Sequence, residues 1–259
     1  LLDRFLHAVT EQAAGVDRHV LVFTAADADA EVAQIRSLAQ RSLADAFVLT
    51  STDHHDRRVD ALVEAGTPFV AFGRPWDEGA APHSWVDVDG RAGTREATEA
   101  CLAAGDRVAF LGWPDGSGAG DERRGGWRDA LVAAGLDADL DRAVEDDPAQ
   151  AQDAAAELLA AGATSIVCAS DTLALGAIGA LSRAEASVPV VGFDDTGVAA
   201  GLGFSSVDQN LGAVAAAVLE LLHGEPAHRL VTPRLHRRAN PRWGLPAQQS
   251  APADGKDAS

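Results

Sequence analysis

The segment VPVVGFDDTGVAA, residues 188–200, decides the fold that this sequence predicts. Its apolar start runs into Gly192 and Phe193, a length and composition typical of a buried parallel strand. Two carboxylates, Asp194 and Asp195, follow at once. A buried strand does not need paired acids at its end, so this segment also predicts a functional site.

The same strand pattern recurs along the chain and alternates with helical patterns. Several of the helical segments end at a glycine, which is typical of a left-handed helix C-cap. Alternating strands and helices predict an α/β protein whose parallel strands are covered by helices on both faces. The expected strands are residues 19–23, 46–50, 68–72, 107–112, 165–170 and 188–193, and the expected helices are residues 30–41, 57–65, 93–104, 123–134, 149–161 and 172–183.

These units allow either one closed barrel or two open sheets. In open sheets, ligands bind beyond the carboxyl ends of the strands. Those ends are mostly polar and acidic here, as a site that contacts hydroxyl groups requires. Residues 1–15 form an amphipathic helical pattern without a strand before it, and the chain opens on Leu1 and contains no methionine. We therefore expect a further strand upstream, and a disordered tail over residues 246–259.

Composition narrows the class of protein. The formal net charge is −18 and Lys256 is the only lysine, so binding of a phosphate backbone by this segment is not expected. The apolar runs are too short for a membrane helix. Cys101 and Cys168 lie in apolar surroundings, which predicts buried, reduced thiols in a cytoplasmic protein.

Two motifs could suggest a bound phosphate or metal, but neither has the other residues that such a site needs. GSGAG at residues 116–120 lacks the lysine of a phosphate loop and precedes Asp121 and Glu122, so a flexible loop is the better interpretation. His54 and His55 follow a strand, but no second cluster of Cys or His has ligand spacing. We expect no metal and no cofactor.

Arg123 and Arg124 open an expected helix, where the helix dipole disfavours cations. They either pair with Asp121 or Glu122, or form a fork that binds hydroxyls or a carboxylate. Asp171 precedes another helix and is expected to be its N-cap.

No catalytic residues are predicted. The chain has no nucleophile elbow and no zinc-protease motif, and adjacent acids on a strand diverge rather than flank a glycosidic bond. A binding protein is favoured, and a glycosidase that uses the acid pair is the enzyme alternative.

Six segments in register resemble the effector-binding domain of LacI/GalR-type transcriptional regulators, over about residues 1–245. Each is weak alone, and their shared order makes the resemblance specific. They are AFVLTSTDHHDRRVDALVEAGTPFVAFGR, VDVDGRAGTREATEACLAAGDRVAFLG, DERRGGWRDAL, SIVCASDTLALGAIGAL, VPVVGFDDT and FSSVDQNLGAVAAAVLELL.

The resemblance implies two open parallel-sheet lobes of the periplasmic-binding-protein type, joined by three crossings near residues 107–110, 205–209 and 228–232. The N-terminal lobe would comprise residues 1–108 plus 208–229, and the C-terminal lobe residues 109–207 plus 230–245. It also implies a side-by-side homodimer, a small sugar-like effector, and operator DNA bound only through an upstream helix-turn-helix domain. A periplasmic solute-binding protein of a transporter shares the fold and is the alternative.

The resemblance also implies roles for single residues. Asp194 and Arg123 would bind effector hydroxyls, and Ser170, Asp89 and Gln209 would line the same cleft. The aromatic platform of many sugar-responsive members is replaced by Glu145, Asp146 and Asp147. Stacking on the ligand would therefore move to Trp113 or Trp76, whereas Asp195 would hold the turn and the hinge.

Overall fold

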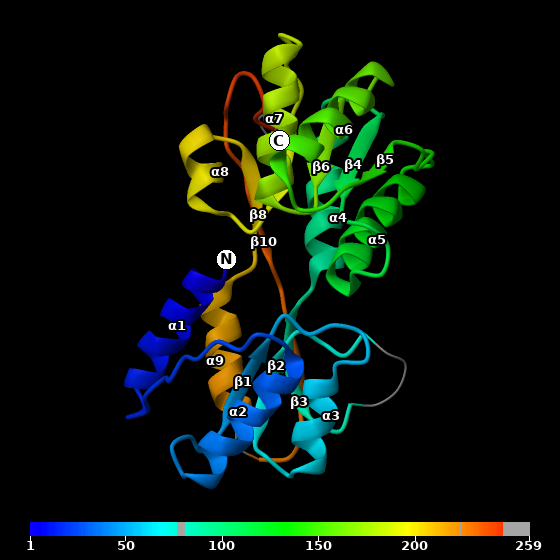
Figure 1. The fold of residues 1–259 in the computed structure, drawn as a ribbon. Helices are drawn as coiled ribbons and strands as arrows, with labels where there is room; N and C mark the ends of the chain where they lie inside the picture. Colours follow the sequence, from blue (N-terminus) through cyan, green and yellow to red (C-terminus); the bar gives the residue numbers. More distant parts are fainter. Residues whose placement is uncertain (77–80, 223, 246–259) are drawn as a thin grey trace, which may run out of the picture.

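The computed structural model of the chain describes residues 1–76, 81–222 and 224–245 (Figure 1). It contains two separate sheets, one in each of two lobes. Neither sheet closes on itself, so the structure is a pair of open sheets and not a barrel. The tail expected to be disordered, residues 246–259, lies outside the described residues.

The N-terminal lobe is built on a four-stranded parallel sheet in the order β1-β2-β3-β9. Helices α1 and α9 pack on one face through Phe5, Val9 and Val214, and α2 and α3 pack on the other through Ile35 and Leu62. The strands are β1 (Phe47–Thr50), β2 (Phe69–Phe72), β3 (Ser84–Val88) and β9 (His228–Val231), and the helices are α1 (Leu2–Ala14), α2 (Ala28–Gln40), α3 (Arg57–Glu64) and α9 (Leu211–Leu221).

The C-terminal lobe holds a six-stranded sheet in the order β10-β8-β7-β6-β4-β5, in which only β10 runs antiparallel to its neighbour. Helix α4 packs on α5, and α6 on α7. The strands are β4 (Val108–Gly112), β5 (Asp141–Ala143), β6 (Ser165–Cys168), β7 (Val190–Phe193), β8 (Ser205–Asp208) and β10 (Arg234–His236), and the helices are α4 (Gly90–Cys101), α5 (Gly118–Ala133), α6 (Pro148–Ala160), α7 (Asp171–Arg183) and α8 (Gly197–Leu202).

The strand expected over residues 19–23 is wrong. This segment has no regular secondary structure, and Leu21 and Val22 are 56% and 61% exposed. A strand needs a neighbour that accepts and donates its backbone hydrogen bonds. No strand among the described residues pairs with this segment, so its apolar pattern alone does not make it a strand.

The first crossing between the lobes lies earlier than expected. Helix α4 joins the C-terminal core through Ala97 and Cys101, so the chain crosses between Val88 and Gly90 rather than near residues 107–110. Close packing of α4 on α5 is the physical reason for the early crossing. A Cβ on Gly126 of α5 would lie 2.1 Å from the carbonyl oxygen of Arg91 of α4, so only glycine allows this approach. The two helix backbones therefore touch, and α4 stays with α5.

The chain passes between the two sheets twice more. The chain leaves the C-terminal sheet after β8 and enters α9 of the N-terminal lobe at residues 209–210. It returns between β9 and β10 at residues 232–233. Since all of β9 pairs with β3, residues 230 and 231 belong to the N-terminal lobe and not to the C-terminal one.

Candidate functional site

Asp194, Gln209 and Arg123 come together beside the second crossing. Asp194 follows β7, and its Oδ1 accepts a 2.5 Å hydrogen bond from Nε2 of Gln209. Nη1 of Arg123 lies 4.0 Å from the same oxygen. Burial raises the pKa of Asp194, and the Arg123 guanidinium acts against that rise. Three separate segments thus supply one charged cluster, in which Arg123 and Gln209 are buried and Asp194 is partly buried.

Arg123 is held in place by its surroundings. Its Nη1 donates to the carbonyl oxygen of Ala169 at 2.5 Å, and its guanidinium lies 3.8 Å from the ring centre of Phe193 and 5.1 Å from that of Trp113. Burial lowers its pKa, and its Nε has no hydrogen-bond partner among the described residues. A buried donor without a partner is costly, so this arginine is an unusual group for a packed interior.

Ser170 and Trp113 meet on Asp146. Ser170 Oγ donates to Asp146 Oδ1 at 2.5 Å, and Trp113 Nε1 donates to the same oxygen at 3.1 Å. Ser170 also accepts from Leu173 N and thereby caps α7. The sequence singled out Asp146 only as part of an acidic run that replaces an aromatic platform. The structure places its carboxylate in the site.

Asp89 lies at the first crossing and caps α4. Its side chain accepts from Ala92 N at 2.9 Å. The next residue, Gly90, packs against the Arg123 side chain, because a Cβ there would lie 3.3 Å from Arg123 Cγ. Asp89 is therefore beside the cluster, although its described hydrogen bond serves the helix.

Two residues of the N-terminal lobe reach the C-terminal lobe on this side. Arg74 pairs with Asp87 at 2.7 Å and lies 3.6 Å from Glu122 of α5. Trp76 packs on the first turn of α5, since a Cβ on Gly118 would lie 2.0 Å from Trp76 Cδ2. Trp76 is thus a contact between the lobes, whereas Trp113 lies against Arg123.

The sequence argument about Arg123 and Arg124 was partly wrong. Helix α5 begins at Gly118, capped by Ser117, so both arginines lie in its second turn and do not oppose the dipole at its first residue. Arg124 pairs with Asp121 at 3.6 Å, as one of the two alternatives predicted, and also with Asp115 at 2.5 Å and with Asp141 at 3.0 Å.

Asp195 has its partners outside the cluster. Its Oδ2 lies 2.6 Å from Nδ1 of His236 and its Oδ1 lies 2.7 Å from Nη2 of Arg238. The two acids of the GFDDT segment therefore have different partners. Asp194 joins the cluster, and Asp195 holds the C-terminal segment beside β8.

Asp171 is not the N-cap that the sequence predicted, because Ser170 caps α7. Asp171 instead accepts hydrogen bonds from the main-chain N of Thr196 at 2.6 Å, from Thr196 Oγ1 at 2.7 Å and from Ser206 Oγ at 2.6 Å. It links α7 to the turn after β7 and to β8. Burial raises the pKa of Asp171 to about 6.

The raised pKa of Asp171 predicts that the free energy of unfolding depends on pH. Because its pKa is raised in the folded state, its contribution is present below the unfolded value of 3.8 and is lost as the pH rises through about 6. Between pH 4 and 7, the native chain should lose about 2–3 kcal/mol of unfolding free energy relative to Asp171→Asn. Urea unfolding at several pH values measures this difference.

Asp129→Asn is the control for that measurement. The hydrogen bond from Arg91 lowers the pKa of Asp129, so its contribution is present above 3.8 and is lost as the pH falls. The difference between native and variant should therefore stay nearly constant from pH 4 to 7 and shrink only as the pH falls below about 4. A difference for Asp171→Asn that stays constant from pH 4 to 7 would show that its carboxylate is not destabilised by burial.

The remaining motifs do not form a second site of this kind. Among the described residues, no group of three or more His, Cys, Asp or Glu is placed to hold a metal ion. Cys101 and Cys168 are both buried free thiols, and burial raises the pKa of Cys101 to about 12. Within the same described ranges, no helix is long and apolar enough to span a membrane.

Two open sheets joined by three crossings, with polar side chains meeting at strand ends beside the crossings, define a two-lobed ligand-binding protein. Comparison with known families gives the same class and refines it. The model of the periplasmic binding proteins and sugar binding domain of the LacI family matches residues 3–242, and this chain belongs to that family.

Similar proteins are transcriptional regulators. The chain is 36% identical to the HTH-type transcriptional regulator CelR of Thermobifida fusca over 164 residues, which cover 60% of this chain and 48% of CelR. A regulatory protein of the LacI family from Chloroflexus aggregans has a TM-score of 0.85 at 31% identity, over 92% of this chain and 91% of that one. A structure of a CelR–cellobiose complex has a TM-score of 0.81 at 28% identity, over 90% and 77% of the two chains.

This chain spans about half the length of most of these curated relatives, 48% of CelR and 52% of AglR of Rhizobium meliloti. The family comprises periplasmic binding proteins and the sugar binding domains of LacI-type regulators, and the similar regulators are not enzymes. The chain therefore corresponds to the ligand-binding part of a LacI-type transcriptional regulator.

Proposed function

We propose that this chain is the effector-binding and dimerisation core of a bacterial LacI-type regulator, and that a sugar or sugar derivative binds between its lobes. The observation that carries the proposal is the cluster of Arg123, Asp194 and Gln209 beside the second crossing. Ser170 and Trp113 would complete the site around Asp146.

The chemistry of this cluster suits a polyol. Each hydroxyl of a sugar both donates and accepts, and the cluster offers carboxylate acceptors next to an arginine with an unused donor. The aromatic ring of Trp113 offers an apolar surface against which the C–H face of a sugar can pack. Asp89 supplies a further carboxylate from the first crossing.

The regulatory mechanism follows from binding at the junction of two lobes. A ligand shifts the arrangement of the lobes only if it binds one arrangement more tightly than another. We propose that this shift alters a homodimer and thereby moves DNA-binding domains outside this chain, in the cytoplasm. The acidic charge of the chain agrees, since operator DNA would be bound by those domains alone. Sedimentation equilibrium that gives a monomer at micromolar concentration would contradict the dimer.

A solute-binding protein of a transporter remains the alternative with the same fold. Relatives that are at least 30% identical are regulators, which favours the regulatory function. No observation favours the glycosidase alternative.

Thermal unfolding against a panel of sugars tests the proposed ligand class. A sugar present at about 100 times its dissociation constant should add about 2.7 kcal/mol to the unfolding free energy. The panel should include cellobiose, with amino acids and nucleosides as comparison compounds, and calorimetric titration should then give a stoichiometry of one sugar per chain. A response to amino acids or nucleosides but to no sugar would reject the proposed class of effector.

A further inference from the structure

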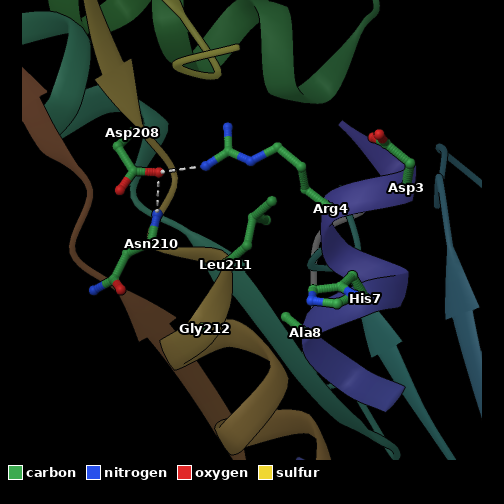
Figure 2. Close-up of a pocket in the computed structure, with 8 residues that line it drawn as sticks. All are labelled: Asp3, Arg4, His7, Ala8, Asp208, Asn210, Leu211 and Gly212. Carbon is green, nitrogen blue, oxygen red and sulfur yellow. Dashed lines mark hydrogen bonds and ion pairs between the residues drawn. The ribbon is translucent and has the colours of Figure 1, made fainter. Parts of the chain in front are cut away.

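Arg4 connects the two lobes through partners other than those of Arg74 and Trp76. It lies on α1 of the N-terminal lobe, and its Nη1 donates to the main-chain oxygens of Asp194 at 2.8 Å and of Asp195 at 2.7 Å. Its Nη2 also pairs with Oδ1 of Asp208 (Figure 2), and these two atoms are 3.6 Å apart. One guanidinium therefore contacts two segments of the C-terminal lobe.

The second crossing separates this contact from the candidate effector site. Asp208 and Asn210 line a pocket of about 540 Å³ together with Arg4 and other residues of α1 (Figure 2). Gln209, which lies between them, donates instead to the Asp194 side chain. Asp194 is thus shared, because its carboxylate belongs to the effector site and its carbonyl oxygen is held by Arg4.

The backbone of these segments needs such support. Asp194, Asp195 and Asn210 have φ angles of 104°, 47° and 56°. Residues other than glycine rarely adopt positive φ angles. Asp208 stabilises the bend at Asn210 by accepting from its main-chain N at 3.2 Å. Arg4 then binds both this carboxylate and the carbonyls of the turn after β7.

We infer that Arg4 is a positioning residue that ties the effector-binding turn to helix α1 of the opposite lobe. This inference rests on the proposed function of Asp194. Arg4 fixes the two carbonyls that orient the turn, so the Asp194 carboxylate is held toward Gln209 and Arg123. Because the same guanidinium spans the lobes, a rotation of one lobe against the other moves this turn. Effector affinity and lobe arrangement are thereby coupled through one side chain.

The first test needs no ligand. Spin labels on Leu43→Cys and Val132→Cys report the distance between the lobes, because these exposed residues lie in different lobes and the native Cys101 and Cys168 are buried. Pulsed electron paramagnetic resonance on the full chain should give a broader distribution of label-to-label distances for Arg4→Ala than for native Arg4. Arg4→Lys keeps the positive charge but not the planar fork of donors, so its distribution should lie between the two.

Arg229→Ala is the matched control for this experiment. Arg229 has similar side-chain exposure, 45% against 41% for Arg4, and pairs with Glu220 within the N-terminal lobe. Its removal should leave the distance distribution unchanged. An unchanged distribution for Arg4→Ala would overturn the inference that Arg4 ties the lobes together.

The second test uses cellobiose as the probe. Arg4→Ala should bind it about tenfold more weakly than the native chain does, the change expected when charge-assisted hydrogen bonds that position the carboxylate are lost. Arg4→Lys should recover part of this loss, and Arg229→Ala should match the native affinity. Native affinity in Arg4→Ala would overturn the positioning role. If the native chain does not bind cellobiose, the result counts against the proposed sugar and not against Arg4. The distance measurement then decides by itself whether Arg4 ties the lobes together.

Discussion

Asp194→Asn is expected to weaken sugar binding at least about 100-fold, or roughly 3 kcal/mol, while the chain still folds. Asparagine keeps the shape and can still accept from Gln209, but it loses the charge and one acceptor oxygen that ligand hydroxyls would use. The free protein should lose only about 1–2 kcal/mol, because Asp87, Asp146 and Asp171 remain near Arg123. Calorimetric titration and urea unfolding measure the two effects.

Asp195→Asn is the matched control on the neighbouring acid. Asp195 pairs with His236 and Arg238 and lies outside the cluster, so its replacement should lower the melting temperature and leave the affinity for the sugar close to the native value. If Asp195→Asn abolishes binding and Asp194→Asn does not, the roles given to the two acids are reversed.

Arg123→Met is the second substitution with a large expected effect. It removes the donors that would bind ligand hydroxyls while its unbranched side chain fills much of the space against Phe193 and Trp113. Binding should again weaken about 100-fold or more. The thermal response to the sugar should disappear at concentrations that saturate the native chain.

Arg128→Met tests whether this loss is specific. Arg128 lies on the same helix α5, but its side chain is 56% exposed and pairs with Asp141. Its replacement should leave the thermal response intact. The double variant Arg123→Met with Asp194→Asn should bind no more weakly than about the worse single variant, because the two residues act on the same ligand groups. Full additivity of the two losses would mean that they contact separate parts of the ligand.

The local pattern of apolar and polar residues was sufficient to predict most of the helices and strands. The apolar run before Gly192 and the alternating helical segments predicted β7 and its neighbours, because a buried parallel strand must be apolar on both faces. The same reasoning failed for residues 19–23, whose composition resembles that of the real strands. Pairing with a neighbour decides whether such a segment is a strand, and pairing is not a local property.

Side-chain partners were harder to predict than elements. Asp171 was expected to cap a helix, yet Ser170 does so and Asp171 joins Thr196 and Ser206. Both residues have side chains that suit an N-cap, so sequence cannot separate them. The sequence drew attention to Asp146 only because it departs from a family pattern. Its contacts with Ser170 and Trp113 join three different loops, so they could not be predicted from neighbouring residues.

The sequence by itself determined that this is an α/β ligand-binding protein of the LacI family, and that the GFDDT segment ends a strand at its site. These features depend on residues that are neighbours in the chain. Only the tertiary structure decided that Ser170 and not Asp171 caps α7, that α4 belongs to the C-terminal lobe, and that Arg4 of the opposite lobe holds the turn. A hydrogen bond of about 3 Å depends on where two distant segments meet, and packing fixes that meeting place.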